Sequence, residues 1–198
     1  MSIKRIITGL ALSMLLSSGV AIAADYDSAY STYQSGSFSA AFKEMLPFAE
    51  QGNIDAQWHI GLMYDKGKGI PKDDKTAVKW YTLAAEQGDA KAQFNLGVMY
   101  ARGEGVPEND KTAVKWFTLA AEQGHAFAQS NLGIMYANGD GVLTDIKRAY
   151  MWNNLASYNS GDWGGDNKDI IAKDMTPADI SKAQDMSSAC LESNYTDC

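Results

Sequence analysis

The sequence predicts an all-α solenoid, built as a stack of helix pairs, and three observations support this. Residues 89–124 match residues 53–88 at 22 of 36 positions, and residues 125–160 follow the same pattern more loosely. Self-similarity at a period between about 20 and 50 residues is typical of solenoid proteins. Within each copy the apolar residues recur with the helical period of 3.6, and a turn rich in glycine and proline separates the two halves.

The first half of the second copy has the pattern of a helix with one apolar face. Ala92, Leu96, Met99 and Tyr100 recur at i, i+4, i+7 and i+8, so they lie on one side of a helix. Gly97 lies beside Leu96, where the missing side chain lets a neighbouring helix come close. We therefore expect close helix packing at the equivalent glycines of the three copies, Gly61, Gly97 and Gly133.

The second half of this copy predicts another helix. The turn Gly103–Pro107 ends the first helix, because its two glycines and its proline disfavour further helix. The next helix should begin near Asn109 or Asp110, since both are good N-caps. Its apolar positions are Ala113, Trp116, Phe117, Ala120 and Ala121. Asp89 is expected to cap the first helix, and Gly124 to end the second in a left-handed conformation.

These positions together resemble the Sel1-like repeat family, which is related to the tetratricopeptide repeats. The residues that carry the likeness are Ala92-Gln93, Leu96-Gly97, Met99-Tyr100, Gly103-x-Gly105-Val106, Ala113, Trp116-Phe117 and Ala120-Ala121-x-x-Gly124. The resemblance covers residues 53 to about 160. It implies a right-handed superhelix of antiparallel helix pairs, a role in protein–protein interaction, and no catalytic activity.

The N-terminal segment Met1–Ala23 has the pattern of an export signal. Lys4 and Arg5 precede a mostly apolar run, and Ala21-Ile22-Ala23 is a small-x-small cleavage site. A membrane anchor is the alternative, but the run is interrupted by serines and glycines and is short for a span. We expect cleavage after Ala23 and a soluble periplasmic or secreted protein that does not insert into a membrane.

The charge of the chain argues against polyanionic partners. The full chain has a net charge of −7, and removal of Lys4 and Arg5 leaves 15 basic and 24 acidic side chains, a net charge of −9. Such a surface repels nucleic acid and anionic lipid. The remaining chain of about 175 residues should form one domain, and we expect a monomer.

The segment that follows the signal, residues 24–52, is expected to be an N-terminal cap that contains one degenerate helix pair. Tyr26, Tyr30 and Tyr33 have helical spacing, and Gly36 should end that helix. Pro47 falls inside the second helix of the pair, where it removes a backbone donor and should kink the helix. Terminal repeats are expected to be atypical because one of their faces meets water.

The third copy and the C-terminal segment depart from the repeat. His125 replaces Asp89, and Asn153 replaces Phe117, which leaves open how far the last helix of the copy extends and what it packs against. Residues 161–198 should cap the stack, with Thr176 as the N-cap of a closing helix. One side of that helix carries Ile180, Ala183, Ser187 and Cys190. The expected units are 1–23, 24–52, 53–88, 89–124, 125–160 and 161–198.

The two cysteines, Cys190 and Cys198, predict a disulfide, because an exported chain reaches an oxidising compartment. Closing so short a loop contributes only about 2.5 kcal/mol in the chain-entropy model. A redox-active pair is the competing interpretation, although such pairs prefer Cys-x-x-Cys at a helix N-terminus. A zinc site lacks enough histidines nearby.

Catalytic chemistry finds no support in the sequence. Neither histidine, His59 or His125, belongs to a nucleophile or metal motif. His59 occupies the position of Asn95 and Asn131, so we expect it at the surface. We expect no catalytic residue, no metal and no cofactor.

The positions that vary between copies predict where a partner binds. On the first helix of each pair they form a stripe, which by resemblance to tetratricopeptide units lines the concave groove of the solenoid. The expected groove residues are Trp58, Leu62, Lys91, Phe94, Val98, Arg102, Phe127 and Ile134. Apolar anchors with a polar rim are typical of surfaces that bind proteins.

The predicted function is therefore a non-catalytic adaptor of the bacterial cell envelope that holds a protein or peptide segment in this groove. One alternative for the stripe is that its side chains only fill the space between neighbouring helices. An alternative for the function is a binder of small ligands or cell-wall fragments, or a hydrolase, in the periplasm.

Overall fold

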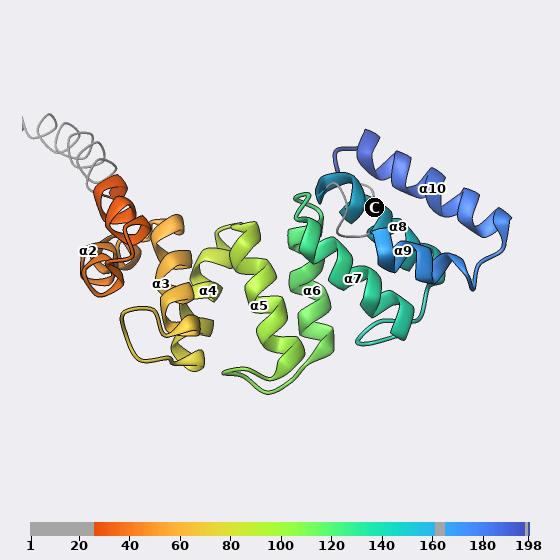
Figure 1. Ribbon diagram of the computed structural model, residues 1–198. Helices are drawn as coiled ribbons and strands as arrows, with labels where there is room; N and C mark the ends of the chain where they lie inside the picture. Colours follow the sequence, from red (N-terminus) through yellow and green to blue (C-terminus); the bar gives the residue numbers. More distant parts are fainter. Residues whose placement is uncertain (1–25, 161–164, 197) are drawn as a thin grey trace, which may run out of the picture.

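The computed structural model describes residues 26–160, 165–196 and 198, and within these ranges the regular elements are all α-helices (Figure 1). Residues 26–34 are helical. The helices that follow are α2 (Phe38–Glu50), α3 (Ile54–Lys66), α4 (Asp74–Glu86), α5 (Ala90–Arg102), α6 (Asp110–Ala121), α7 (Ala126–Asn138), α8 (Ile146–Ser160), α9 (Gly165–Ala172) and α10 (Pro177–Glu192). The expected export signal and its cleavage site after Ala23 lie outside the described residues.

The helices form an α-solenoid of antiparallel pairs, as predicted. From α2 to α9 each helix packs on the next one along the chain. The three repeats are the pairs α3–α4, α5–α6 and α7–α8, which follow one another along the molecule (Figure 1). Their cores consist of small and apolar side chains, such as Ala92, Leu96 and Phe117, that are almost inaccessible to solvent.

The first helix of each repeat begins at an equivalent capping residue. The side chains of Asn53 and Asp89 accept hydrogen bonds from the backbone N–H three residues later, at 2.8 and 2.6 Å. His125 takes the same role in the third repeat, where its Nδ1 accepts from the N–H of Ala128 at 3.3 Å. The predicted cap of the second helix is Asn109 rather than Asp110, since Asn109 accepts from the N–H of Thr112.

Close packing at the predicted glycines is confirmed. A Cβ atom added to Gly97 would lie 2.7 Å from Cδ1 of the Phe117 ring, and one added to Gly61 would lie 2.7 Å from Cδ1 of Tyr81. Real Cβ atoms essentially never approach that closely. In the third repeat a Cβ at Gly133 would meet the amide of Asn153. The glycine therefore leaves room for the side chain that packs against it from the second helix, whether that side chain is aromatic or polar.

A chain of side-chain amides connects successive repeats. Gln57 donates to the carbonyl of Ala49 at 3.1 Å, and its own oxygen accepts from Gln87 at 2.7 Å. The same two bonds recur one repeat later with Gln93, Ala85 and Gln123, and again with Gln129, Ala121 and Asn159. Each buried amide thus satisfies a carbonyl at the end of the preceding pair, because a buried acceptor without a partner is costly.

The structure shows how far the second helix of the third repeat extends and what Asn153 contacts. Its second helix, α8, runs to Ser160, and Asn153 is fully buried within it. The Asn153 amide donates to the carbonyl of Ala149 at 2.9 Å, and Ser130 donates its hydroxyl proton to Oδ1 of Asn153 at 3.3 Å. The amide of Asn167, in α9, donates to the hydroxyl of Ser130 at 3.2 Å. A buried polar cluster therefore replaces the aromatic contact of the earlier repeats.

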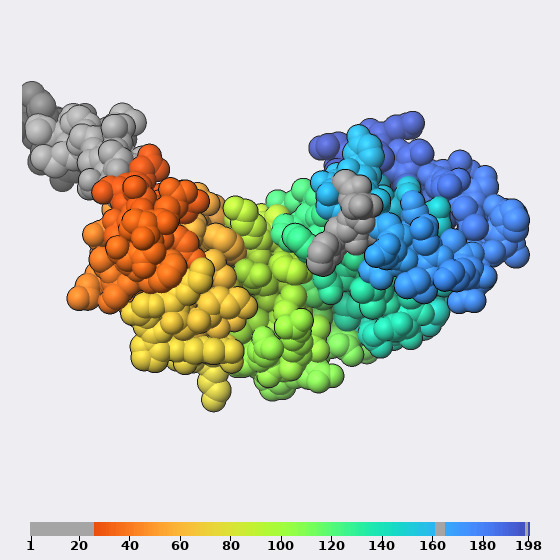
Figure 2. All heavy atoms as spheres, in the orientation of Figure 1, coloured from red at the N-terminus to blue at the C-terminus, as the bar shows by residue number. Residues whose placement is uncertain are grey.

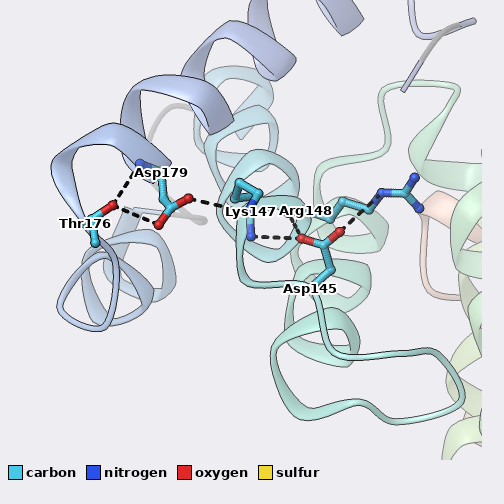
Figure 3. A network of polar contacts seen from close by, with 5 residues as sticks. All are labelled: Asp145, Lys147, Arg148, Thr176 and Asp179. Carbon is cyan, nitrogen blue, oxygen red and sulfur yellow. Dashed lines mark hydrogen bonds and ion pairs between the residues drawn. The ribbon is translucent and has the colours of Figure 1, made fainter.

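The C-terminal helix α10 closes the stack by packing on α8. Thr176 accepts from the N–H of Asp179, as expected for its N-cap, and Ala183, Ser187 and Cys190 are buried. Lys147 of α8 donates to Asp179 of α10 at 3.4 Å, which joins the beginnings of the two helices (Figure 3). The predicted disulfide, Cys190–Cys198, is present.

Candidate functional site

The face that carries the predicted stripe lies on the first helices of the repeats, α3, α5 and α7. The N-terminal ends of these helices point to the upper side of the view in Figure 1. That side of the molecule is hollowed between the N-terminal and C-terminal ends, which rise on either side of the middle repeats (Figure 2). The long turns after α3 and α5 lie on the opposite, lower side (Figure 1).

The apolar stripe residues of the first two repeats are half-buried. Trp58 and Leu62 pack against the apolar cluster of α4 and α5, which belongs to their own and the next repeat. Phe94 and Val98 pack in the same way against the cluster of α6, α7 and α8. These four side chains therefore do fill space between neighbouring helices, and each also keeps part of its surface exposed.

Aromatic and cationic side chains on this face contact one another across the repeats. The Lys91 ammonium lies 5.0 Å from the centre of the Trp58 ring, and such cation–π contacts are favourable. The Phe94 ring is stacked on the imidazole of His125, with 4.8 Å between the ring centres. Phe127 lies 6.1 Å from both of these rings. We call the five residues Trp58, Lys91, Phe94, His125 and Phe127 the aromatic row.

The third repeat contributes to the stripe differently from the first two. Phe127 and Ile134 are the most exposed of the apolar stripe residues, with 44% and 39% of their surface accessible. Ser130 takes the position of Phe94, but it is buried and contacts α9 through Asn167. Arg102, at the end of α5, is exposed and pairs with Glu104 of the long turn at 3.9 Å.

His59 is buried, so the sequence-based expectation that it lies at the surface was wrong. Only 8% of its surface is accessible. Its Nδ1 lies 2.8 Å from the carbonyl oxygen of Asp55 and 3.0 Å from the hydroxyl oxygen of Tyr26, and the rings of Tyr30 and Tyr33 lie against the imidazole. The N-terminal helix covers this position in the first repeat, whereas Asn95 and Asn131 have no such cover.

The two histidines and Tyr26 beside this face are uncharged at pH 7. Burial lowers the pKa of His59 and of His125, so both imidazoles are neutral at pH 7. Burial, with the nearby Asp55 carboxylate, raises the pKa of Tyr26, which stays protonated. Among the described residues no cluster of histidine, cysteine or acidic side chains could hold a metal ion.

A cavity of about 460 Å³ lies away from the stripe. It is formed at the long turn of the third repeat by Tyr136, Val142, Leu143, Thr144, Asp145 and Arg148. None of these residues belongs to the predicted groove. In the described ranges, no helix has the length and apolar character needed to cross a membrane.

Sequence reasoning missed three features of this region: the burial of His59, the stacking of His125 on Phe94, and the amide chain. Each depends on a residue from a neighbouring repeat or from the N-terminal helix. Gln93 recurs at the equivalent position of each repeat, and Gln123 has an equivalent in the first repeat. This repetition was the one available signal for the amide chain.

Comparison with known proteins places these features in a family. The profile of the Sel1 repeat matches residues 54–89, 90–125 and 126–161, one residue out of register with the units expected from the sequence. A Sel1 repeat protein from Oxalobacter formigenes is similar in structure, with a TM-score of 0.72 and 31% identity over 80% of this chain and 65% of that one. No curated protein gave a significant match.

A second similar structure is c5321, a protective antigen present in uropathogenic Escherichia coli strains that displays an SLR fold. It is 31% identical, with a TM-score of 0.52, over 79% of this chain and 42% of its own. The chain thus spans about two thirds and two fifths of the lengths of these two proteins. Since the three repeat matches cover more than half of its length, the chain belongs to the Sel1 repeat family, whose members generally mediate protein–protein interactions and are typically not catalytic.

Proposed function

We propose that this protein is an adaptor of the bacterial cell envelope that holds a segment of another protein along the first helices of its repeats. The aromatic row carries the proposal. The rings of Phe94, His125 and Phe127 contact one another across a repeat boundary, and the Trp58 ring contacts the exposed Lys91 of the next repeat. Aromatic anchors beside charged rim residues are typical of the energetically important centres of protein interfaces.

The position of the row in the solenoid supports the same function. The N-terminal ends of α3, α5 and α7, from which most of the row projects, reach the hollowed side of the molecule (Figures 1 and 2). An extended segment lying in this hollow would contact all three repeats. In the third repeat Ser130 replaces the aromatic ring of Phe94, whereas Phe127 and Ile134 still offer exposed apolar surface to the segment.

The envelope location rests on two independent features. The N-terminal residues have the pattern of an export signal, and the structure contains the disulfide Cys190–Cys198, a bond that forms and persists in oxidising compartments. The expected mature protein begins at Ala24. Mass spectrometry of the exported protein tests this, and an intact Met1 in the membrane fraction would contradict it.

Photocrosslinking in cells tests the groove. A crosslinking amino acid at position 91 or 94 should capture one defined protein, whereas the same group at Leu143, an exposed residue of the long turn in the third repeat, serves as the control. Trp58→Ala and Phe94→Ala should abolish capture from position 91. Because both side chains also pack between repeats, the variants must first show a folded solenoid by circular dichroism.

The outcomes separate this function from its alternatives. Unchanged capture in folded Trp58→Ala and Phe94→Ala variants, together with loss on changing the second helices, would show that the groove assignment is wrong. Capture of a glycan fragment instead of a protein would support the ligand-binding alternative.

A further inference from the structure

The outer face of the second helices repeats the same pattern of three side chains. In α2, α4 and α6 the sixth residue is a lysine, an apolar residue follows four positions later, and a glutamate follows three positions after that. Positions i, i+4 and i+7 share one face of a helix. The three rows are Lys43, Lys79 and Lys115; Pro47, Leu83 and Leu119; and Glu50, Glu86 and Glu122.

The lysine and glutamate rows together contain six charged side chains. Among the described residues, none of the six takes part in an ion pair, and all six are exposed. Other cations of the repeats do have acidic partners, for example Lys72 with Asp74 at 3.2 Å and Lys66 with Asp65 at 3.0 Å. Leu83, between its lysine and its glutamate, exposes 45% of its surface.

Helix stability does not explain this arrangement. Lys75 and Lys79 form a like-charge i,i+4 pair on α4, and Lys111 and Lys115 repeat it on α6. Glu86 is the last residue of α4, where it faces the negative end of the helix dipole. Both placements disfavour the helix, and both occur in two successive repeats.

The third repeat shows that this face can receive a helix. On α8 the lysine position holds Met151 and the next position holds Leu155, and both are fully buried in a cluster that contains Cys190 of α10. Lys147, the equivalent of Lys75 and Lys111, pairs there with Asp179 of α10 (Figure 3). Where the chain supplies a helix to cover this face, an acid of that helix pairs with a lysine of the covered helix.

We propose that the outer face of α2, α4 and α6 binds a second copy of this chain as a two-fold symmetric dimer. The pattern is self-complementary: a two-fold axis running across the helices, along the row of Pro47, Leu83 and Leu119, makes the helices of the two copies antiparallel. Lys79 of one copy then faces Glu86 of the other, and the leucines meet at the axis. Each of the three helices thus forms two ion pairs with its counterpart: its lysine pairs with the partner copy's glutamate, and its glutamate with the partner copy's lysine.

A second copy fits this face better than an acidic partner protein does. The glutamate row lies on the same exposed surface as the lysine row and would repel an acidic helix, whereas a second copy neutralises both rows. The dimer replaces the monomer expected from the sequence. It uses the second helices only, so the face that carries the aromatic row stays open and the dimer does not depend on the proposed adaptor function.

Sedimentation velocity of the purified exported protein tests the proposal. The wild type should be a concentration-dependent dimer whose dissociation constant rises at least about tenfold between low and high salt, because exposed ion pairs are screened. The variants Lys79→Glu/Lys115→Glu and Glu86→Lys/Glu122→Lys should each be monomeric, since like charges then face each other. Lys173→Glu/Lys182→Glu, which changes the charge equally on the C-terminal cap, should dimerise like the wild type.

Mixing the two monomeric variants provides the decisive measurement. At positions 79, 86, 115 and 122 one variant carries only acids and the other only lysines, so an equimolar mixture should form a heterodimer and recover most of the wild-type affinity. All changes are at exposed positions, and circular dichroism confirms folding. A wild type that stays monomeric at concentrations of hundreds of micromolar, or a mixture that does not associate, overturns the proposal; so does a dimer that Trp58→Ala dissociates and the charge variants leave intact.

Discussion

The second and third repeats share one backbone plan but fill it with different side chains. In the second repeat Gly97 lies under the ring of Phe117, which contacts Phe94 with 6.0 Å between ring centres. In the third, Gly133 lies under the amide of Asn153, which is hydrogen-bonded to Ser130. Both members of the aromatic pair have been exchanged for polar residues together.

This difference shows what the solenoid requires and what it tolerates. The close approach of the two helices depends on the glycine, whereas the side chain above it can be aromatic or polar, provided that a buried polar group finds its partners. The outer face changes as well, from the exposed Lys115 to the buried Met151 under α10. The third repeat is thus adapted to be the last one, since terminal units must be covered.

The largest effect is expected where the glycine itself is lost. Gly97→Leu should lower the free energy of unfolding by about 3 kcal/mol or more, because even its Cβ would overlap the Phe117 ring. Thermal and urea unfolding measure the loss. Lys91→Leu, which places the same side chain at an exposed position of the same helix, is the control; it loses only the cation–π contact with Trp58 and should cost at most about 1 kcal/mol.

Reduction of the disulfide should lower the free energy of unfolding by less than Gly97→Leu does. The loop between Cys190 and Cys198 spans only 8 positions, so we expect a loss of about 2.5 kcal/mol in the chain-entropy model. Cys190 lies in the core cluster of the last repeats, and Tyr195 donates to Asn159 at the end of the amide chain. A loss on reduction larger than that of Gly97→Leu would contradict the view that the stack, and not its tail, holds the fold.

The polar cluster of the third repeat should contribute to the free energy of unfolding about as much as one buried hydrogen-bonded pair does. Asn153→Ala leaves the Ser130 hydroxyl without its acceptor and opens a small cavity, for an expected loss of about 2 kcal/mol. A double-mutant cycle with Ser130→Ala isolates the pair, and Asn154→Ala, on the adjacent residue, is the control. Additive single and double changes would show that the two side chains act independently.

The sequence was sufficient for features that each repeat determines within itself. The caps Asp89 and Asn109, the close approach at Gly97 and the N-cap Thr176 follow from local residue types, and the structure contains all four. Gly124 has the predicted left-handed φ of +77°, although α6 already ends at Ala121. Helix α2 continues through Pro47 to Glu50.

Features that depend on contacts between repeats escaped prediction. His59 is buried because three tyrosines of the irregular N-terminal helix converge on it, and no periodic pattern indicates that contact. The pairing of Asn153 with Ser130 joins positions 23 residues apart, and neither residue by itself indicates the contact. The groove residues themselves were chosen by variability between copies, and their binding role stays a prediction.

The smallest expected effect concerns pH and distinguishes the third repeat from the first two. His125 caps α7 through Nδ1, which must be unprotonated to accept the N–H of Ala128, while Asp89 caps α5 with a carboxylate. Burial lowers the pKa of His125 in the folded state; Asp89 raises it in part, and Lys91 lowers it further. The unfolded chain therefore binds a proton more readily than the folded one.

The stability that comes from neutral His125 is fully present above the unfolded-state pKa of about 6.5 and is lost as the pH falls towards the lower folded-state value. We expect unfolding at pH 5.5 to require about 1 kcal/mol less than at pH 7.5, the worth of one N-cap. His125→Asn keeps a capping side chain, as Asn53 does in the first repeat, and should reduce this pH dependence. His59, whose pKa burial also lowers, accounts for the remainder, so His59→Asn on top of it should flatten the profile. An unchanged slope between pH 5.5 and 7.5 in the double variant would show that carboxylates, not these imidazoles, set the pH dependence.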